Sequence, residues 1–277
     1  MRAVVSVLAC MLTIGGVSLL LTGCNEARAS ASASPRPTAT PSMGVPGIDV
    51  PPTPSVPFRM LFVGASITAG SGASTPMLAY PQMLAAQVAR EVGRVDPVVV
   101  GHGGAVAAQA SRWPLPEGED LIMVHLATND FEHANPIPSY GAEYRALLAR
   151  LRATSPIASI ICLGVWAAST DVNRLGLRPA AYDAEVRSAC QSMGGSFVPL
   201  MGIYAEPDLH APPARWRVMG GRAGLAGPDV MEGREIGFHP NDAGHERIAG
   251  AVFTAVQDRR MLRPPGQFAG ARLARFA

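Results

Sequence analysis

Lysine is absent from this sequence of 277 residues: arginine supplies all 23 basic side chains, which nearly balance 21 acidic ones. The formal net charge is +2, and charged residues make up only 16% of the chain. No stretch of interleaved basic and aromatic residues precedes the C-terminal end, so nothing indicates a nucleic-acid partner. Only the last segment, 261–277, is distinctly basic, and we expect a solvated tail that can contact anionic lipid.

Cysteine is scarce as well, and its distribution excludes the usual metal sites. The sequence has four cysteines, Cys10, Cys24, Cys162 and Cys190, and none is grouped with histidine at the spacing of a zinc site. No GxGxxG segment opens a helix after a strand, so no dinucleotide site is indicated either. We therefore expect neither a metal nor a cofactor.

The chain begins with a segment that has the features of an export signal. Arg2 is followed by an apolar run, 3–21, which ends in Leu21-Thr22-Gly23-Cys24. These last four residues resemble the bacterial lipobox, which implies removal of residues 1–23 and lipidation of Cys24. A membrane-spanning or plain secretory segment is the alternative, although the run is short for a spanning helix. We expect an extracytoplasmic protein that Cys24 anchors to the cell membrane.

Residues 24–57 consist mainly of alanine, serine, proline and threonine. Such a composition buries too little apolar surface to offset the entropy of ordering, and its prolines favour an extended tether. The roughly 200 residues that follow suffice for one well-buried domain. We therefore expect a single domain over 58–260, followed by the tail 261–277.

Two cysteines, Cys162 and Cys190, remain in this domain once Cys10 has left with the leader and Cys24 has been lipidated. Outside the cytoplasm such a pair can persist as a disulfide. Two buried thiols that behave as small apolar side chains are the alternative. Sequence alone does not show whether the two α-carbons are close enough to bond.

Short apolar runs alternate along the domain with stretches of helical period. The runs are typical of strands buried on both faces and lie at 60–63, 98–100, 121–126, 157–165 and 197–200. The helical stretches lie at 80–92, 140–151, 180–192 and 242–256. This alternation predicts an α/β fold in which helices cover both faces of a parallel sheet. The functional crevice of such a sheet lies at the carboxyl ends of its strands.

Chemistry-bearing residues follow the first three apolar runs. Ser66 stands in the small-residue turn 64–68 and is a candidate nucleophile. The glycine-rich segment 101–104, which ends in Gly104, lets backbone N–H groups approach an oxyanion. Asn129, in 127–130, offers a side-chain amide donor. Each segment alone is also ordinary turn chemistry.

A histidine precedes the last helical stretch. In the segment 239–242, Asn241 or Asp242 can cap the helix, which places His239 in the loop before it. His239 is therefore the candidate base. His245 lies inside the helix, and we interpret it as structural.

The four segments, in this order, resemble the SGNH (GDSL-like) hydrolase family. GAS, with Ser66, is similar to the family's GDS block, and the segment ending in Gly104 is similar to its glycine block. ATND, with Asn129, is similar to its GxND block, and HPND, with His239, is similar to its histidine block. The resemblance implies a three-layer α/β/α sandwich with a mostly parallel five-stranded sheet of the flavodoxin-like type. It also implies a serine esterase whose oxyanion is held by the Ser66 and Gly104 N–H groups and the Asn129 amide.

The sequence departs from the family pattern at the acid. The family places an orienting Asp three residues before the histidine, and Ile236 stands there. An acid holds the histidine tautomer and stabilises the imidazolium, so its loss slows catalysis strongly. Three alternatives remain open: Glu235 is the acid, a backbone carbonyl or water orients His239 in a serine–histidine dyad, or the domain is degenerate and either inactive or slow. Two smaller departures, Ala65 and Ala127, keep the backbone path.

We predict an esterase that hydrolyses a carboxylic ester, acyl or O-acetyl, on a small molecule, a polysaccharide or a lipid. Trp113 and Trp166 are candidates for stacking on a sugar or lining an acyl pocket; anchoring in the core or a loop is the alternative. A surface-displayed binding module and an acyltransferase are the competing functions. The oligomeric state is open.

Overall fold

The computed structural model describes residues 56–212, 229–231 and 234–262, and within 229–236 it describes only the backbone. The predicted leader, the predicted lipidation site Cys24 and the greater part of the predicted tether lie outside these residues, as does the tail from residue 263 onward. The expectations about these segments therefore stay predictions.

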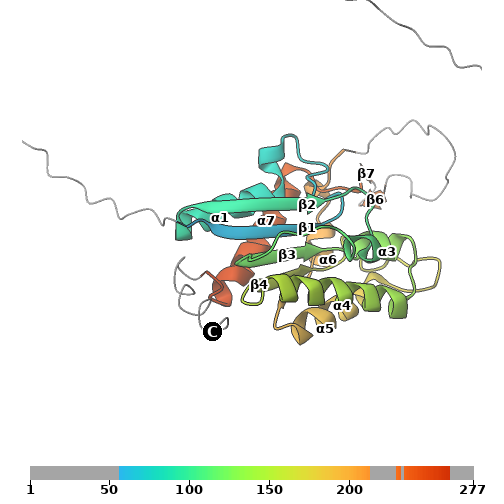
Figure 1. Ribbon diagram of the computed structural model, residues 1–277. Helices are drawn as coiled ribbons and strands as arrows, with labels where there is room; N and C mark the ends of the chain where they lie inside the picture. Colours follow the sequence, from blue (N-terminus) through green and yellow to red (C-terminus); the bar gives the residue numbers. More distant parts are fainter. Residues whose placement is uncertain (1–55, 213–228, 232–233, 263–277) are drawn as a thin grey trace, which may run out of the picture. The chain divides into compact units, whose positions relative to one another are not determined.

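The centre of the fold is a five-stranded sheet in which every strand pair is parallel. Its order is β2-β1-β3-β4-β5, so the chain starts inside the sheet and winds outward in both directions (Figure 1). The strands are β1 (Phe58–Gly64), β2 (Val95–Gly101), β3 (Leu121–His125), β4 (Ser159–Leu163) and β5 (Ser196–Val198). Each overlaps one of the apolar runs, and the predicted α/β fold is confirmed.

Four long helices connect and cover the strands: α1 (Tyr80–Val92), α4 (Ile137–Thr154), α5 (Pro179–Ser192) and α7 (Asp242–Asp258). They occupy the four predicted helical stretches, and α1 begins and ends at the predicted residues. Shorter helices, which the periodicity did not predict, are α2 (Ala107–Ala110), α3 (Thr128–Glu132) and α6 (Met201–Tyr204). No helix in the described part of the chain is both long and apolar enough to cross a bilayer.

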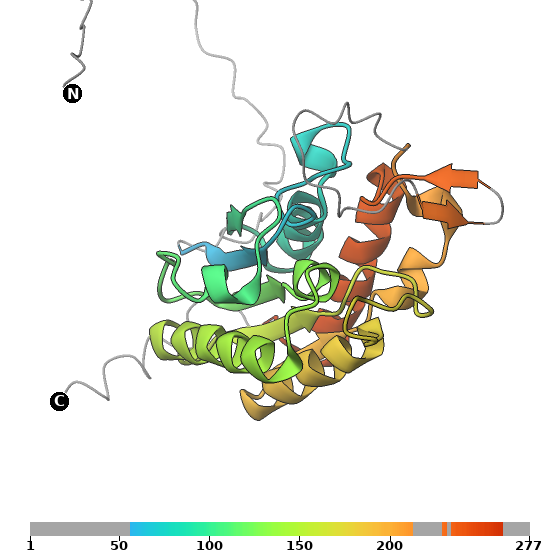
Figure 2. The same cartoon turned by 90° about the vertical axis from the view of Figure 1, so that its right-hand side faces the viewer.

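Alternate residues of the strands enter two separate cores, one on each face of the sheet. In β1, Leu61 and Val63 pack with α4 and α5, whereas Met60 and Phe62 pack with α1 and α7. Figure 2 shows α4 and α5 on one side of the sheet and α1 and α7 on the other. Because both faces are covered, the strands are apolar without alternation, which is why they appear in the sequence as continuous runs.

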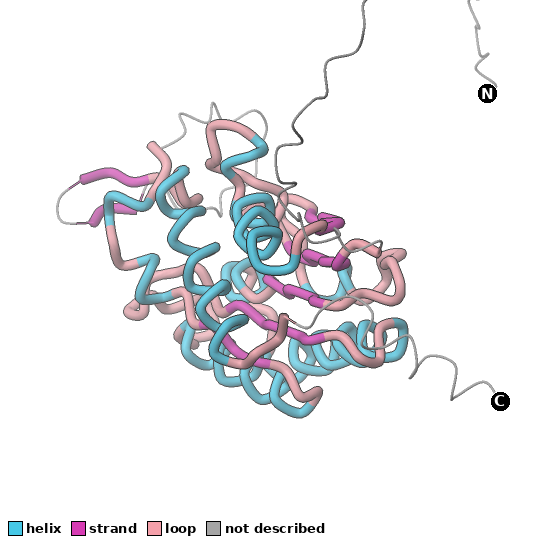
Figure 3. The backbone as a smooth tube through the Cα atoms, turned by 90° about the vertical axis from the view of Figure 1, so that its left-hand side faces the viewer, coloured by secondary structure: helices cyan, strands magenta, loops and turns pink. Residues whose placement is uncertain are grey.

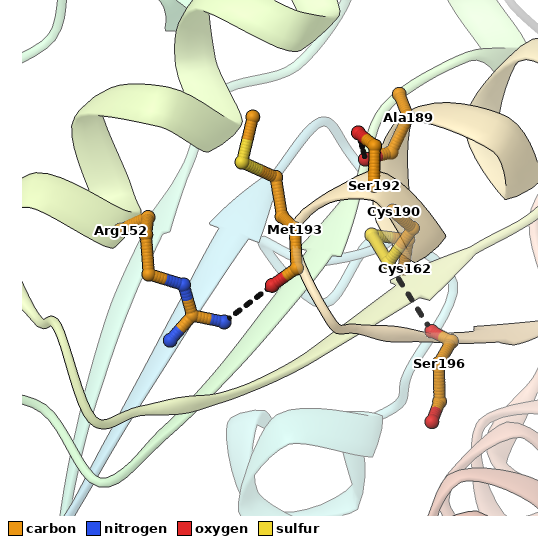
Figure 4. Close-up of a disulfide and its surroundings, with 7 residues drawn as sticks. All are labelled: Arg152, Cys162, Ala189, Cys190, Ser192, Met193 and Ser196. Carbon is orange, nitrogen blue, oxygen red and sulfur yellow. Dashed lines mark hydrogen bonds between the residues drawn. A yellow bond between two sulfur atoms is a disulfide. The ribbon is translucent and has the colours of Figure 1, made fainter.

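A disulfide joins Cys162 in β4 to Cys190 in α5 (Figure 4). Their α-carbons are 6.2 Å apart, and both residues are fully buried. Of the two alternatives, the structure therefore has the bridge, which fastens α5 to the sheet across a separation of 28 residues. A link of this loop length typically stabilises a fold by about 2–4 kcal/mol.

A two-stranded antiparallel sheet, β6 (Asp229–Met231) with β7 (Arg234–Ile236), precedes the segment that carries His239. Figure 3 shows this hairpin apart from the strands of the central sheet. Strands of three residues carry too little pattern to be recognised in a sequence.

Candidate active site

Ser66 lies directly beyond the carboxyl end of β1, in a tight turn. The Ser71 N–H donates to the Ser66 carbonyl at 2.9 Å, and the Ala69 N–H donates to the Ala65 carbonyl at 3.0 Å. These bonds wind the backbone into a helical turn that begins at the serine. Ser66 remains half-buried between apolar Ala65 and Ile67. The turn thus presents a fixed hydroxyl at the edge of the sheet where a functional crevice is expected.

His239 approaches this serine from the loop before α7. Its Nε2 lies 2.9 Å from Ser66 Oγ, although 173 residues separate the two in the sequence. Asn241 caps α7, because its side-chain oxygen accepts from the Gly244 N–H at 2.9 Å. Burial lowers the pKa of His239 below its ordinary value. The ring is therefore neutral over more of the pH range, as an acceptor of the serine proton must be.

Two contacts fasten the loop after β1, which carries Ser66 (the serine loop), to the loop that carries His239 and leads into α7 (the histidine loop). The Asp242 carboxylate accepts hydrogen bonds from the Ser74 N–H at 2.7 Å and from Ser74 Oγ at 2.6 Å, which lower the pKa of Asp242. Gly72, at φ +94°, lies so close to the second loop that a Cβ there would be 2.0 Å from the Pro240 carbonyl oxygen. Only glycine fits this approach.

A small cavity of about 10 Å³ lies beside Ser66. Asn129, Thr128 and His125 line it together with apolar neighbours of the serine. A space of this size holds one oxygen atom or one water but no larger group. Asn129 Nδ2 donates to the Ala105 carbonyl at 2.9 Å. Since a primary amide has two N–H groups, one remains to donate to an oxyanion in this cavity.

Gly104 lies in the turn just before Ala105, the residue that accepts from Asn129. It is exposed and has φ +75°, a conformation that favours glycine even though a Cβ would meet nothing within 4 Å. Gly104 is not among the described residues that line the cavity. Its N–H as an oxyanion donor therefore stays a prediction.

The predicted acid, Glu235, and the substituted position Ile236 both lie in β7. Only the backbone is described there, so whether Glu235 orients His239 stays a prediction. The ion pairs between described side chains do not include His239. Groups of His, Cys, Asp or Glu that could hold a metal are absent from the described part of the chain.

The two candidate tryptophans differ in their surroundings. Trp166 is fully buried, and its Nε1 donates to the Phe238 carbonyl at 2.7 Å. It is therefore an anchor for the histidine loop and not a platform for substrate. Trp113 is half-buried, and its ring packs against exposed His102, 4.5 Å between ring centroids, in the glycine segment. Of the two, Trp113 alone remains a candidate for substrate contact.

His245 uses both of its ring nitrogens within the fold. Nδ1 accepts from the Tyr80 N–H at 3.2 Å, and Nε2 donates to the Ser71 carbonyl at 3.1 Å. Burial lowers its pKa, which favours this neutral tautomer. The arrangement agrees with the structural interpretation of His245.

Asp130 and His210 were not singled out from the sequence. The buried Asp130 carboxylate accepts from the Ala107 N–H at 3.1 Å and from Asn135 Nδ2 at 2.8 Å, so it connects α2 to the segment of Asn129. Its place beside Asn129 in ATND was the available signal. His210 contacts the histidine loop, as described below, and no sequence pattern marks it.

This fold, with a serine–histidine pair at its carboxyl edge, is that of SGNH-type carboxylic ester hydrolases. The chain belongs to the GDSL-like lipase/acylhydrolase family, which its sequence matches over residues 62–247. No curated protein matches the chain.

Three solved structures illustrate the similarity in fold. A possible lipase from Chitinophaga pinensis is 15% identical, with 74% of this chain and 99% of the other covered and a TM-score of 0.51. A carbohydrate esterase family 2 enzyme from Corynascus thermopiles (Myceliophthora fergusii) is 17% identical, with 77% and 69% covered and a TM-score of 0.52. Esterase EstA from Pseudoalteromonas sp., in a structure inhibited by monoethylphosphonate, is 13% identical, with 73% and 98% covered and a TM-score of 0.52. At these identities they show the fold alone.

Proposed function

We propose that this protein is an extracytoplasmic serine esterase in which Ser66 is the nucleophile and His239 the general base. The observation that carries this proposal is the 2.9 Å contact between Ser66 Oγ and His239 Nε2 at the carboxyl edge of the sheet. A nucleophile and a base within hydrogen-bonding distance are what acyl transfer through a covalent intermediate requires.

The reaction proceeds in two displacements. Ser66 Oγ attacks the ester carbonyl carbon while its proton passes to His239 Nε2. The tetrahedral oxyanion lies in the small cavity, where the Ser66 N–H and the Asn129 amide donate to it, with the Gly104 N–H as the third donor. His239 returns the proton to the leaving alcohol, and an acyl-Ser66 ester remains. Water, deprotonated by His239, then releases the carboxylic acid and restores the serine.

The substrate class is a carboxylic ester, either an acyl ester or an O-acetyl group on a carbohydrate or lipid. The lipobox at Cys24 supports a location on the outer side of the membrane, where such substrates occur. In this proposal residues 24–57 hold the domain away from the membrane. Detergent partitioning of the mature wild-type protein, and release of a Cys24→Ala variant that keeps full esterase activity, is the result expected.

Two variants test the chemistry. Ser66→Ala and His239→Ala should each lower hydrolysis of a short chromogenic ester at least about 10³-fold, because nucleophile and base act as one unit. Ser139→Ala and His133→Ala, which change exposed residues of the same types, should leave the rate unchanged. Full activity in Ser66→Ala would exclude the proposed mechanism.

The two competing functions give different results in the same assays. A binding module with a degenerate site would neither hydrolyse any short ester nor react with a fluorophosphonate. An acyltransferase would react with the fluorophosphonate but would transfer the acyl group to an added alcohol faster than to water. Product analysis with and without the alcohol therefore separates transfer from hydrolysis.

A further inference from the structure

The loop that carries His239 is held by three consecutive backbone carbonyls. The Gly237 carbonyl lies 3.0 Å from His210 Nδ1, and the Phe238 carbonyl accepts from Trp166 Nε1 at 2.7 Å. The His239 carbonyl accepts from the Ala211 N–H at 2.8 Å. The donors come from two separate segments: Trp166 follows β4, and His210 and Ala211 are neighbours in the chain. Together they hold every carbonyl from residue 237 to residue 239. A loop anchored in this way cannot move its histidine without breaking buried hydrogen bonds.

The ring of His210 lies between two carbonyl oxygens. Its Nδ1 faces the Gly237 oxygen, and its Nε2 lies 2.7 Å from the Tyr204 oxygen. Carbonyl oxygens only accept, so a neutral imidazole can satisfy one of them and turns a lone pair toward the other. A proton on Nδ1 lets the ring donate to the Gly237 carbonyl, which belongs to the loop that carries His239. His210 is 6% exposed, so water contributes little to satisfying these groups.

Aromatic rings pack around His210. The Tyr204 ring is perpendicular to it with centroids 4.6 Å apart, and the Trp166 ring lies 5.3 Å away. These two rings restrict the orientation of the imidazole. The His210 carbonyl also accepts from Asn241 Nδ2 at 3.0 Å, so the residue is bonded to the histidine loop on both sides of His239.

Trp166 connects the histidine loop to the segment that carries Asn129. Its backbone N–H donates to Thr128 Oγ1 at 3.0 Å, one residue before Asn129. The indole is fully buried between the end of β4 and the loop. Trp166 therefore fixes the histidine relative to the amide that stabilises the oxyanion.

We propose that His210, donating from Nδ1 to the Gly237 carbonyl, and Trp166, donating to the Phe238 carbonyl, are positioning residues that hold His239 against Ser66. The inference rests on the proposed function, since it concerns the base of that reaction. In this inference, hydrogen bonds to the backbone carbonyls of the histidine loop place His239. The chain has Ile236 where the family has an orienting Asp. Neither residue contacts the reacting atoms. A displacement of the base by about 1 Å costs on the order of 10²-fold in rate, which is the effect these anchors prevent.

The kinetic test removes the two N–H donors and keeps an aromatic ring at each position. His210→Phe and Trp166→Phe are compared with wild type for kcat and KM on a short chromogenic ester, each corrected for the sites that a fluorophosphonate titrates at completion. We expect kcat and the fluorophosphonate reaction rate per titrated site to fall 10- to 100-fold, with KM within about twofold. His210→Gln, which keeps an N–H donor, should regain part of the loss.

A matched control separates positioning from general destabilisation. Leu148→Ala creates a cavity in the opposite core, where it destabilises the fold without touching the histidine loop. It should lower Tm and leave kcat per titrated site unchanged. Values of kcat per titrated site within threefold of wild type in both His210→Phe and Trp166→Phe would overturn the proposal.

A spectroscopic measurement on the wild-type protein tests whether His210 is a hydrogen-bond donor, even if a variant fails to fold. In ¹⁵N NMR spectra of the wild-type protein, we expect His210 Nδ1 to carry a proton that exchanges slowly with water, because it is hydrogen-bonded to the Gly237 carbonyl. A His210 Nδ1 without a proton would overturn its role as donor to the Gly237 carbonyl. Wild-type protein that neither hydrolyses esters nor reacts with the fluorophosphonate would contradict the proposed function instead. The NMR experiment does not depend on activity, so it would still test the hydrogen bond donated by His210.

Discussion

Asn129 Nδ2 donates a 2.9 Å hydrogen bond to the Ala105 carbonyl, which joins the amide beside Ser66 to the residue after Gly104. The same amide lines the small cavity where an oxyanion fits. In the proposed mechanism, Asn129 both holds the residue after Gly104 and offers its second N–H to the oxyanion. The proposed oxyanion donors are then coupled through this one side chain.

Replacement of Asn129 should for this reason affect turnover more than substrate binding. Asn129→Ala is expected to lower kcat about 10²- to 10³-fold, the usual effect of removing one oxyanion donor, with little change in KM. Steady-state kinetics on a chromogenic ester measures both constants. Asn173→Ala removes an amide of the same type outside the cavity and should keep kcat. A large rise in KM at constant kcat would instead place Asn129 in ground-state binding.

The acid is tested by two substitutions in β7. If Glu235 orients His239, Glu235→Gln should lower kcat/KM on the order of 10⁴-fold, the penalty for a missing triad acid. If the backbone anchors alone place the histidine, the change should be under about tenfold, and Ile236→Asp should raise the rate by supplying a carboxylate at the family's spacing. Measured kcat/KM values for both variants distinguish the two arrangements.

The strand–helix order, the covering of both sheet faces and the positions of Ser66, Asn129 and His239 were predictable from the sequence. They depend on local signals: apolar runs such as that of β1, amphipathic periods such as that of α1, and small-residue turns after strands. The anchors of the histidine loop were not predictable. His210 and Trp166 act on backbone carbonyls far away in the sequence, and a backbone acceptor can belong to any residue type.

Trp166 illustrates the same limit. Its place after a strand suggested the crevice, but the sequence does not show whether a tryptophan that follows a strand faces outward or inward. Trp166 faces inward because its buried indole N–H requires an acceptor, and the Phe238 carbonyl supplies one.

Ala127 occupies a conformation that favours glycine. Its φ of 154° and ψ of −32° precede α3, where the family's third block has Gly. Ala127→Gly should relieve backbone strain and stabilise the fold by about 1 kcal/mol, the strain of such a residue less the entropy that glycine loses on folding. Urea unfolding measures the difference. Ala86→Gly, at an exposed position inside α1, is the control and should destabilise by about 1 kcal/mol.

Asp183 makes the stability of the fold depend on pH. It is 5% exposed, and burial raises its pKa to about 6 even though one oxygen accepts from the Val165 N–H at 2.7 Å. Because the pKa of Asp183 is higher in the folded protein than in the unfolded chain, the folded protein binds this proton more tightly, and protonation of Asp183 stabilises the fold. The contribution is full below about pH 4, is lost as pH rises through about 6, and amounts to roughly 3 kcal/mol at most.

Asp183→Asn removes this titration and keeps an oxygen to accept from Val165. The variant should gain stability over wild type as pH rises from 4.5 to 7.5, as measured by urea unfolding at both values. An equal difference between wild type and variant at the two pH values would show that Asp183 does not titrate in this range.

The central claim, that Ser66 is a nucleophile activated by His239, is tested most directly by mapping the site of a covalent phosphonate adduct by mass spectrometry. After brief exposure of the wild-type protein to a fluorophosphonate, one adduct should form, on the peptide that contains Ser66. It should be absent from Ser66→Ala and strongly reduced in His239→Ala. An adduct on any other residue, or equal labelling of Ser66 in wild type and His239→Ala, would contradict the account.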